Sequence, residues 1–175
     1  MHLSWLWFIL GLSLIVGANP VKPSSPKSGK PGSSKPVKSG SINEGDSRLR
    51  CGVVAFEPDG RVWMVASKKD GYILPKGGYD EDEDSNMHDC VEREAKEEAG
   101  VEVDRDSIEA LPVKDGSVHW FKCTVSSHGA RTDPELAKRK PPKAYSVPKA
   151  WEMLKKGDQE KKQGMHKALR AATEE

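Results

Sequence analysis

Residues 93–101 read REAKEEAGV, and this nonapeptide, with the loop before it, decides the fold of the chain. Residues three and four positions apart share one face of a helix, so Glu94, Glu97 and Glu98 would present three carboxylates together. Like charges at this spacing are tolerated when water solvates them or when a divalent cation neutralises them. Oxygen ligands in a compact cluster suit Mg²⁺, which completes its shell with water and substrate phosphate.

The segment upstream favours a binding site over a solvated helix face. Taken alone, the nonapeptide is compatible with ordinary surface ion pairs such as Glu92 with Lys96. However, an extended stretch runs into residues 74–78, LPKGG, and an acidic loop follows over 80–84. The two glycines allow backbone to approach a metal or a phosphate, and Lys76 provides a cation for an anion.

Hydrophobic patterning around this stretch predicts strands interleaved with helices. Ser85 or Asn86 is suited to cap the central helix, and Gly100 is suited to end it. Apolar residues recur every four positions along that helix and predict its buried face, at Met87, Val91, Ala95 and Ala99. We expect strands over 50–56, 62–67, 72–74, 108–113, 118–125 and 144–147, and a second helix over 148–156. This order predicts a mixed, layered α/β domain.

The composition divides the chain into segments. Residues 1–18 hold an apolar run too short to span a membrane, followed by small residues, which predicts a cleaved signal peptide and a secreted protein. Residues 19–46 are rich in Pro, Lys, Ser and Gly and predict a disordered basic linker. Residues 47–157 form the predicted domain, and 158–175 a C-terminal tail that could be a loose helix. The net charge of +1 marks the chain as neither a nucleic-acid nor a membrane binder.

The three cysteines, Cys51, Cys90 and Cys123, are expected to be small buried residues with free thiols. Their odd number and wide spacing do not predict a disulfide framework or a zinc site. A secreted protein without disulfides would be suited to a reducing compartment.

The helix and the loop before it resemble the Nudix hydrolase signature. That signature is Gly, five residues, Glu, seven residues, Arg-Glu, an aliphatic residue, any residue, Glu-Glu, any residue and Gly, then an aliphatic residue. Gly77 and Glu83 keep the first interval, and residues 93–101 keep the second half. Nine residues, not seven, separate Glu83 from Arg93, so Glu81 is an alternative for Glu83. The resemblance implies an α/β/α sandwich with a mixed β-sheet.

Within the family, the chain is similar to fungal-type diphosphoinositol polyphosphate phosphohydrolases, which also act on diadenosine polyphosphates. The similarity lies in residues 48–50, RLR, residues 67–69, SKK, and the lengthened loop after LPKGG. It implies that Glu94 and Glu98 bind Mg²⁺, or Mn²⁺, together with a backbone carbonyl at Lys76 or Gly77. It also implies that Glu97 is the base that activates water, with Glu98 as the alternative, and that Arg93 holds the glutamates in place.

A polyphosphate substrate needs several cations and no surface for base stacking. The candidate substrate-binding residues are Arg48, Arg50, Ser67, Lys68, Lys69, Lys76, Gly78 and Lys140, and the segment 138–143 is placed to close the other side. A substrate with an adenine base would instead need an aromatic clamp, for which Trp63, Tyr79, Trp120 and Phe121 are candidates.

Secretion narrows the hypothesis further. Inositol pyrophosphates are intracellular compounds, so the combination is similar to Nudix effectors that plant pathogens deliver into host cells, where they would perturb phosphate signalling. The partner is a small-molecule polyphosphate, with no nucleic acid and no membrane span after signal cleavage. A host protein partner is not identified by the sequence. A non-catalytic binding protein on the same fold is the alternative from another class.

Overall fold

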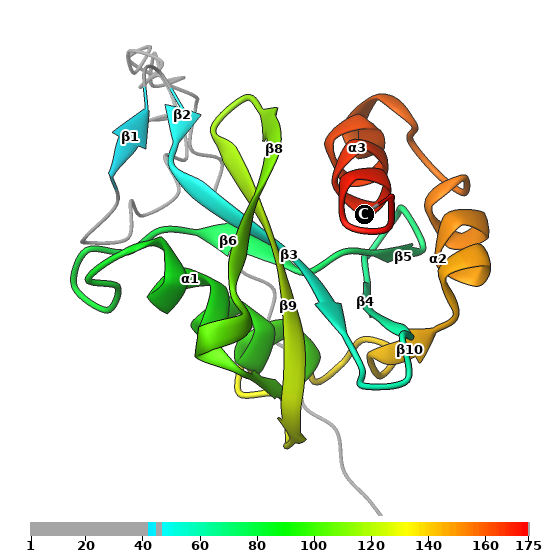
Figure 1. Cartoon of the computed structure of the whole chain (residues 1–175), viewed down its shortest axis with the longest axis horizontal. Helices are drawn as coiled ribbons and strands as arrows, with labels where there is room; N and C mark the ends of the chain where they lie inside the picture. The colour runs from blue at the N-terminus through cyan, green and yellow to red at the C-terminus, as the bar shows by residue number, and fades with distance from the viewer. Residues whose placement is uncertain (1–41, 45–46, 175) are drawn as a thin grey trace, which may run out of the picture. The chain divides into compact units, whose positions relative to one another are not determined.

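The computed structural model describes residues 42–44 and 47–174 of the chain (Figure 1). The signal-peptide prediction and nearly all of the linker prediction lie outside these residues. The strands are β1 (Asn43–Glu44), β2 (Ser47–Arg48), β3 (Arg50–Phe56), β4 (Val62–Ala66), β5 (Tyr72–Ile73), β6 (Lys76–Gly78), β7 (Val101–Val103), β8 (Glu109–Asp115), β9 (Val118–His128) and β10 (Lys143–Tyr145). The helices are α1 (Met87–Glu94), α2 (Val147–Leu154) and α3 (Gln163–Ala171), with short turns η1 (Ala95–Ala99), η2 (Arg105–Ser107) and η3 (Glu160–Lys162).

The main sheet is mixed, and its order is β10-β4-β3-β9-β7. The central pair, β3 and β9, runs parallel, whereas the other pairs are antiparallel, including β6 on β3 and β8 on β9. β3 is buried along most of its length because helices cover the sheet on both faces.

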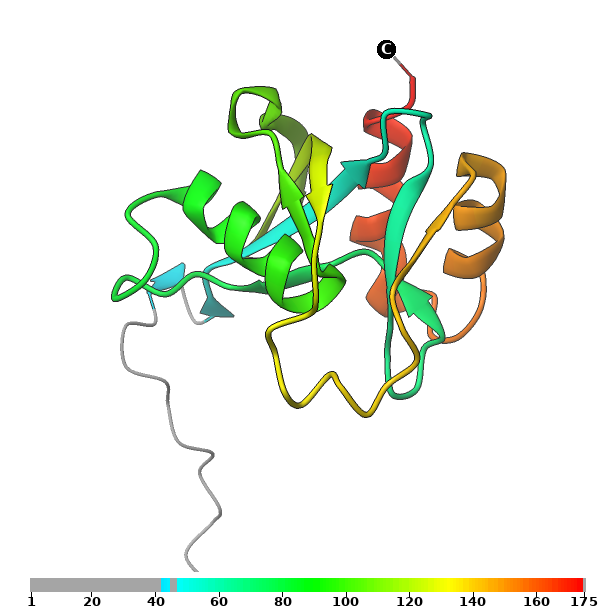
Figure 2. The same ribbon diagram turned by 90° about the horizontal axis from the view of Figure 1, so that it is seen from below.

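Helices lie on both faces of this sheet, as Figures 1 and 2 show. On one face, α1 and η1 pack through Val91, Ala95 and Ala99 onto alternate residues of β3 and β9. On the other face, α2 and α3 pack onto the remaining residues of the same strands, through side chains such as Leu154 and Leu169. The α/β/α sandwich with a mixed β-sheet is therefore confirmed.

The helical segment formed by α1 and η1 together begins and ends at the residues that the sequence predicts. Asn86 is its N-cap, and its side chain accepts hydrogen bonds from the backbone N–H groups of His88 and Asp89 in a capping box. Gly100 follows η1 in the left-handed conformation, with φ of 68°. The last turn differs from the expectation, because η1 is a π-helix and not a continuation of the α-helix. Such wide turns within helices are frequent at functional sites.

Four parts of the chain differ from the sequence-based expectations. Residues 76–78, expected as loop, form β6, and residues 101–103 form β7. Asn43–Glu44, placed in the predicted linker, pairs with β2. The tail beyond residue 157 contributes Met165, Ala168 and Leu169 to the core, so it belongs to the packed body. Within the described ranges, no helix is both long and apolar enough to cross a membrane.

The expectation of three free cysteines is wrong, because Cys51 and Cys90 form a disulfide across 39 residues of sequence. Cys51 lies on β3 and Cys90 on α1, and both are fully buried. Sequence spacing could not show this pair, since the packing of α1 on β3 brings the two residues together. The argument for a reducing compartment, which rested on an absence of disulfides, loses its basis. Cys123 stays free, and burial raises the pKa of its thiol to about 12.

We expect the double variant Cys51→Ala/Cys90→Ala to lower the free energy of unfolding by about 2–4 kcal/mol, because the disulfide restricts the unfolded chain. Urea unfolding with and without a dithiol reductant measures this effect. The double variant also serves as the control for the reductant, because it has no disulfide to reduce. Reductant should therefore lower the urea midpoint of the wild type and leave that of the variant unchanged. An unchanged midpoint for the wild type in reductant would contradict the prediction.

Candidate active site

The carboxylates of the REAKEEAGV segment gather where the end of α1 and η1 pass over β6. Glu94 is 6% exposed, and Glu98 accepts a hydrogen bond through Oε2 from the backbone N–H of Lys76 at 2.9 Å. Glu97 is the more open of the three, with 34% of its side chain exposed. The structure therefore brings Glu94 and Glu98 to the glycine loop, whereas Glu97 faces solvent.

Gly77 and Gly78 are required by close contacts with charged side chains. A Cβ on Gly77 would lie 1.8 Å from Oε1 of Glu94, and one on Gly78 would lie 2.3 Å from Cζ of Arg48. Only residues without a side chain let the β6 backbone come this near to both groups. The expectation that these glycines allow close backbone approach therefore matches the geometry, and the group approached from Gly77 is a carboxylate.

We expect Gly77→Ala to lower kcat/KM for a pyrophosphate substrate at least about tenfold, because displacing a reacting group by about 1 Å can cost a hundredfold. The added methyl group has to push the Glu94 carboxylate away from β6. Gly129→Ala is the matched control, since a Cβ there lies 3.8 Å from the nearest atom, the carbonyl oxygen of Gly100. Steady-state kinetics of both variants checks the prediction, and equal activities would contradict it.

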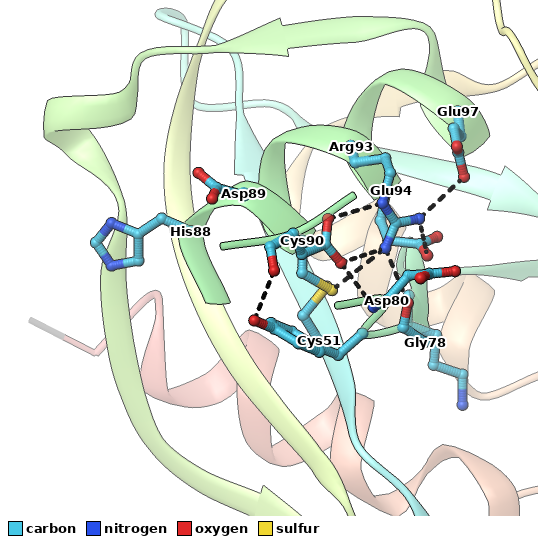
Figure 3. Close-up of a disulfide and its surroundings, with 12 residues drawn as sticks. Cys51, Gly78, Asp80, His88, Asp89, Cys90, Arg93, Glu94 and Glu97 are labelled. Atoms are coloured by element: carbon cyan, nitrogen blue, oxygen red, sulfur yellow. Dashed lines mark hydrogen bonds and ion pairs between the residues drawn. A yellow bond between two sulfur atoms is a disulfide. The ribbon is translucent and has the colours of Figure 1, made fainter. Parts of the chain in front are cut away.

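Arg93 joins the acidic loop, β6 and the end of α1 with η1 (Figure 3). Its Nε and Nη2 donate to the two carboxylate oxygens of Asp84 at 2.9 and 2.7 Å. Nη2 also donates to the carbonyl of Gly78 at 2.8 Å. Nη1 donates to Glu94 at 3.0 Å and to Glu97 at 3.3 Å. The guanidinium thus fixes two of the three glutamates, which is the positioning role that the resemblance implies.

Asp84 is the partner of Arg93 that the sequence did not indicate. It is 2% exposed, its Oδ2 accepts from the backbone N–H of Asp80, and its carbonyl accepts from the hydroxyl of Tyr79. Glu83, which the signature suggested, lies 3.5 Å from Nε of Arg93 and is largely exposed. The loop is longer than in the signature, and Asp84, the residue after Glu83, makes the close pair with Arg93.

Desolvation and neighbouring negative charge raise the pKa of two carboxyls of this site, those of Glu94 and Glu98. Desolvation raises the pKa of Glu98 to about 7, and the charge of Glu94 acts in the same direction. Burial also raises the pKa of Glu94, against the opposing effect of Arg93. Desolvation lowers the pKa of Lys76, assisted by the charge of Arg50. The hydrogen bond with Asp84 raises the pKa of Arg93, which therefore stays charged.

These features fit a divalent cation. The raised pKa values show that the ionised forms of Glu94 and Glu98 are disfavoured, and a bound cation would favour them. Gly77 brings backbone against one of them, as a carbonyl ligand requires. In the described part of the chain, no three acidic, His or Cys side chains converge on one point as a complete metal cage. Mg²⁺ does not need such a cage, since waters and substrate phosphates provide much of its shell.

The predicted substrate-binding residues fall into two groups. The first group contains three basic side chains, Arg48, Arg50 and Lys76, of which Arg50 and Lys76 interact electrostatically with Glu98. Arg48 donates to the carbonyl of Tyr79 at 3.2 Å, while its Nε is buried without a hydrogen-bond partner. Arg50 starts β3 opposite Gly78, and its charge acts on both Glu94 and Glu98.

The second group lines a hollow of about 390 Å³ between the loop after β4 and the segment before β10. Lys68, Lys69 and Lys140 are exposed there, and Ser67 lies at its edge. Arg139, which the sequence analysis placed only within a basic run, lines this hollow and an adjoining one of about 580 Å³. Its Nε is buried without a partner, and its charge lowers the pKa of Glu98. Arg139 therefore links the second group to the carboxylates.

The candidate aromatic clamp does not form. Trp120, Phe121 and Tyr79 are 1%, 5% and 8% exposed and pack in the core. Trp63 is partly exposed, and its indole N–H donates to the buried carboxylate of Glu57. Among the four candidates, only Trp63 presents a surface that a base could reach.

A model of the NUDIX domain family matches residues 46–168. Among solved structures, an ADP-ribose pyrophosphatase from Streptococcus suis is 22% identical, covering 71% of this chain and 91% of that chain, with a TM-score of 0.45. A pyrophosphohydrolase from Bacillus subtilis is 15% identical, covering 64% of this chain and 66% of that chain, with a TM-score of 0.41. No curated protein matches the chain. The family match runs from the start of β2 into α3 and includes every residue of the candidate site.

Proposed function

The chain belongs to the Nudix domain family and is a hydrolase of pyrophosphate-containing small molecules, and we propose that its substrate is a diphosphoinositol polyphosphate. The observation that carries this proposal is the distribution of cations around the carboxylates. The charges of Arg50 and Arg139 act on Glu98, the charge of Glu98 acts on Lys76, and Arg48 lies against Gly78. Arg139 also lines the hollow that contains the exposed lysines. A ring that bears many phosphates needs such dispersed positive charge.

Two further observations support a polyphosphate over an adenine compound. Three of the four candidate stacking aromatics are core residues, so a base would have only Trp63 to contact. A hollow of about 560 Å³ along α1 is lined by five acidic residues and two basic ones, Arg93 and Lys96, so its net negative charge disfavours phosphates. The basic hollows are the surfaces whose charge is complementary to a polyphosphate.

The proposed roles follow from the contacts. Glu94 and Glu98, with backbone at Gly77, would hold Mg²⁺ or Mn²⁺, which neutralises charge on the diphosphate oxygens when bound. Glu97 is the proposed base, because its open carboxylate can reach a water while Arg93 holds one of its oxygens. Glu98 is the alternative base, since a pKa of about 7 suits proton transfer near neutral pH. The basic residues hold the phosphates that do not react.

A substrate panel tests the proposal. The full chain is incubated with diphosphoinositol pentakisphosphate, diadenosine polyphosphates and ADP-ribose, each with Mg²⁺, with Mn²⁺ and with chelator. Cleavage is measured as orthophosphate released from the inositol compound and as nucleotide products formed from the adenine compounds. We expect the inositol compound to be cleaved with the highest kcat/KM, and only with a divalent cation present. Cleavage of the adenine compounds alone would overturn the substrate assignment but not the enzyme class. No turnover of any pyrophosphate compound would favour the non-catalytic alternative.

We also propose that the protein is secreted and acts inside a host cell, where inositol pyrophosphates are made. The apolar run within residues 1–18 supports export, and the Cys51–Cys90 disulfide is compatible with passage through an oxidising compartment. Sequencing the amino terminus of the exported protein should place it at Asn19. Detection of the protein in the extracellular space only, during infection, would contradict the host-cell role.

A further inference from the structure

Lys162 is a fully buried lysine outside the carboxylate site. It ends η3, between α2 and α3, and is 1% exposed, which is rare for a lysine. Its ammonium donates to two backbone carbonyls, those of Asp70 and Lys156. Burial lowers the pKa of Lys162, and the negative charge of Asp70 opposes this effect. A buried cation with two defined acceptors fixes the segments to which those acceptors belong.

The two carbonyls come from segments far apart in the sequence. Lys156 lies just beyond the C-terminal end of α2, where helix carbonyls lack partners and the helix dipole favours a cation. Asp70 lies in the loop 67–71, between β4 and β5. The ammonium of Lys162 therefore ties this loop to the end of α2.

Other contacts show how closely the loop sits against that end. Gly157 has φ of 82°, and a Cβ there would lie 2.9 Å from Cα of Asp70. The loop is closed on itself, since the N–H of Ser67 donates to the carbonyl of Gly71 at 2.7 Å. The Ser67 hydroxyl accepts from the N–H groups of Lys69 and Asp70 at 3.4 and 3.3 Å. Asp70 is thus held by Ser67 within the loop and by Gly157 and Lys162 outside it.

The opposite side of the same loop carries the cations of the basic hollow. Lys68 and Lys69 are exposed there, facing the segment that contains Arg139 and Lys140. Two lysines on a loose loop would have to be ordered when a phosphate binds, which weakens affinity. A loop held in place before binding avoids part of that cost.

We propose that Lys162 is a positioning residue for the substrate, which holds the loop 67–71 so that Lys68 and Lys69 face the phosphates. This inference rests on the proposed function. It gives the C-terminal segment a role in substrate affinity although no residue after 157 was predicted to bind substrate. Because Lys162 lies behind the loop, its loss should weaken binding and leave the chemical step unchanged.

The test compares Lys162→Met with Lys162→Arg and with Lys167→Met, an exposed lysine of α3 that serves as the matched control. KM and kcat are measured on diphosphoinositol pentakisphosphate, and the affinity for inositol hexakisphosphate is measured by calorimetry. We expect Lys162→Met to raise KM and the hexakisphosphate Kd about tenfold with kcat within about twofold of wild type. The KM and Kd of Lys162→Arg should fall between those of the wild type and those of Lys162→Met. Lys167→Met should match the wild type.

A fall in kcat at unchanged KM, or a wild-type KM and Kd in folded Lys162→Met, overturns the inference. If Lys162→Met does not fold, Asp158→Ala takes its place, because the Asp158 carboxylate accepts hydrogen bonds from the N–H groups of Glu160 and Lys161 in η3 at 3.1 and 3.4 Å. Its KM should rise in the same direction by a smaller factor, and an unchanged KM overturns the inference. A wild type that cleaves no diphosphoinositol polyphosphate defeats the proposed function, while the hexakisphosphate titration still measures the effect of Lys162.

Discussion

Glu98→Gln is expected to lower kcat for a pyrophosphate substrate by at least about a hundredfold at pH 8, since a positioned acid–base group contributes about 10²–10⁴-fold. The same loss follows if Glu98 holds the cation, because glutamine is a neutral and weaker ligand for Mg²⁺. The amide can still accept the hydrogen bond from the N–H of Lys76, so the local fold should persist. Activity should therefore be lost without loss of structure.

The same substitution should stabilise the metal-free protein above neutral pH. The carboxyl of Glu98 has a pKa of about 7 in the folded protein, against an ordinary value of 4.5. Between these values the folded state binds more protons than the unfolded state, so the free energy of unfolding falls as pH rises. Each pKa unit corresponds to about 1.4 kcal/mol, and partial exposure of the side chain reduces the total to about 1–3 kcal/mol. Glutamine does not titrate and removes this loss.

Urea unfolding at pH 5 and pH 8, in chelator and in Mg²⁺, checks both parts of this prediction. The matched control is Glu152→Gln, an exposed residue of α2 paired with Lys149, which should alter neither activity nor the pH dependence. Mg²⁺ should stabilise the wild type at pH 8 more than it stabilises Glu98→Gln. A Glu98→Gln protein that keeps wild-type turnover would remove Glu98 from the site.

Arg93→Met should destabilise the protein by about 3–5 kcal/mol, the usual result of removing one partner from a buried ion pair. The substitution keeps an apolar stem of similar length but leaves the buried carboxylates of Asp84 and Glu94 without their cation. The carbonyl of Gly78 would also lose its donor. Hydrolysis should fall at the same time, because Glu94 and Glu97 lose the contact that orients them.

Arg105→Met is the matched control, because it tests how far the effect of Arg93→Met depends on the burial of the arginine side chain. Arg105 also contacts two carboxylates, those of Asp89 and Glu92, but its side chain is 47% exposed. Surface pairs contribute about 0–1 kcal/mol, so this variant should remain close to the wild type. Adding Asp84→Asn to Arg93→Met should recover part of the lost stability, since it removes one unpaired charge. Urea midpoints of the four proteins decide the matter, and equal losses for the two arginines would contradict the prediction.

The sequence by itself determined the central helix and most of its chemistry. Asn86, Gly100 and the apolar stripe act over three or four residues, so their effect on α1 follows from local spacing. The same spacing placed Glu94, Glu97 and Glu98 on one helix. The absence of a side chain on Gly77 and Gly78 indicated that backbone could make close contacts there. The signature identified the loop and the helix as one unit, and that unit is part of the family match.

Only the tertiary structure decided which distant residues meet. Asp84, and not Glu83, makes the closer and buried pair with Arg93, because the loop turns so that Asp84 accepts hydrogen bonds from Asp80 and Tyr79. Cys51 and Cys90 join only because α1 lies on β3, and Lys162 reaches Asp70 across 92 residues of sequence. Such contacts depend on the packing of whole elements, for which a single sequence carries no local signal. Residue spacing along the chain therefore determined which segments form helices and strands. Packing between distant elements determined which charged side chains are buried, paired or free to bind substrate.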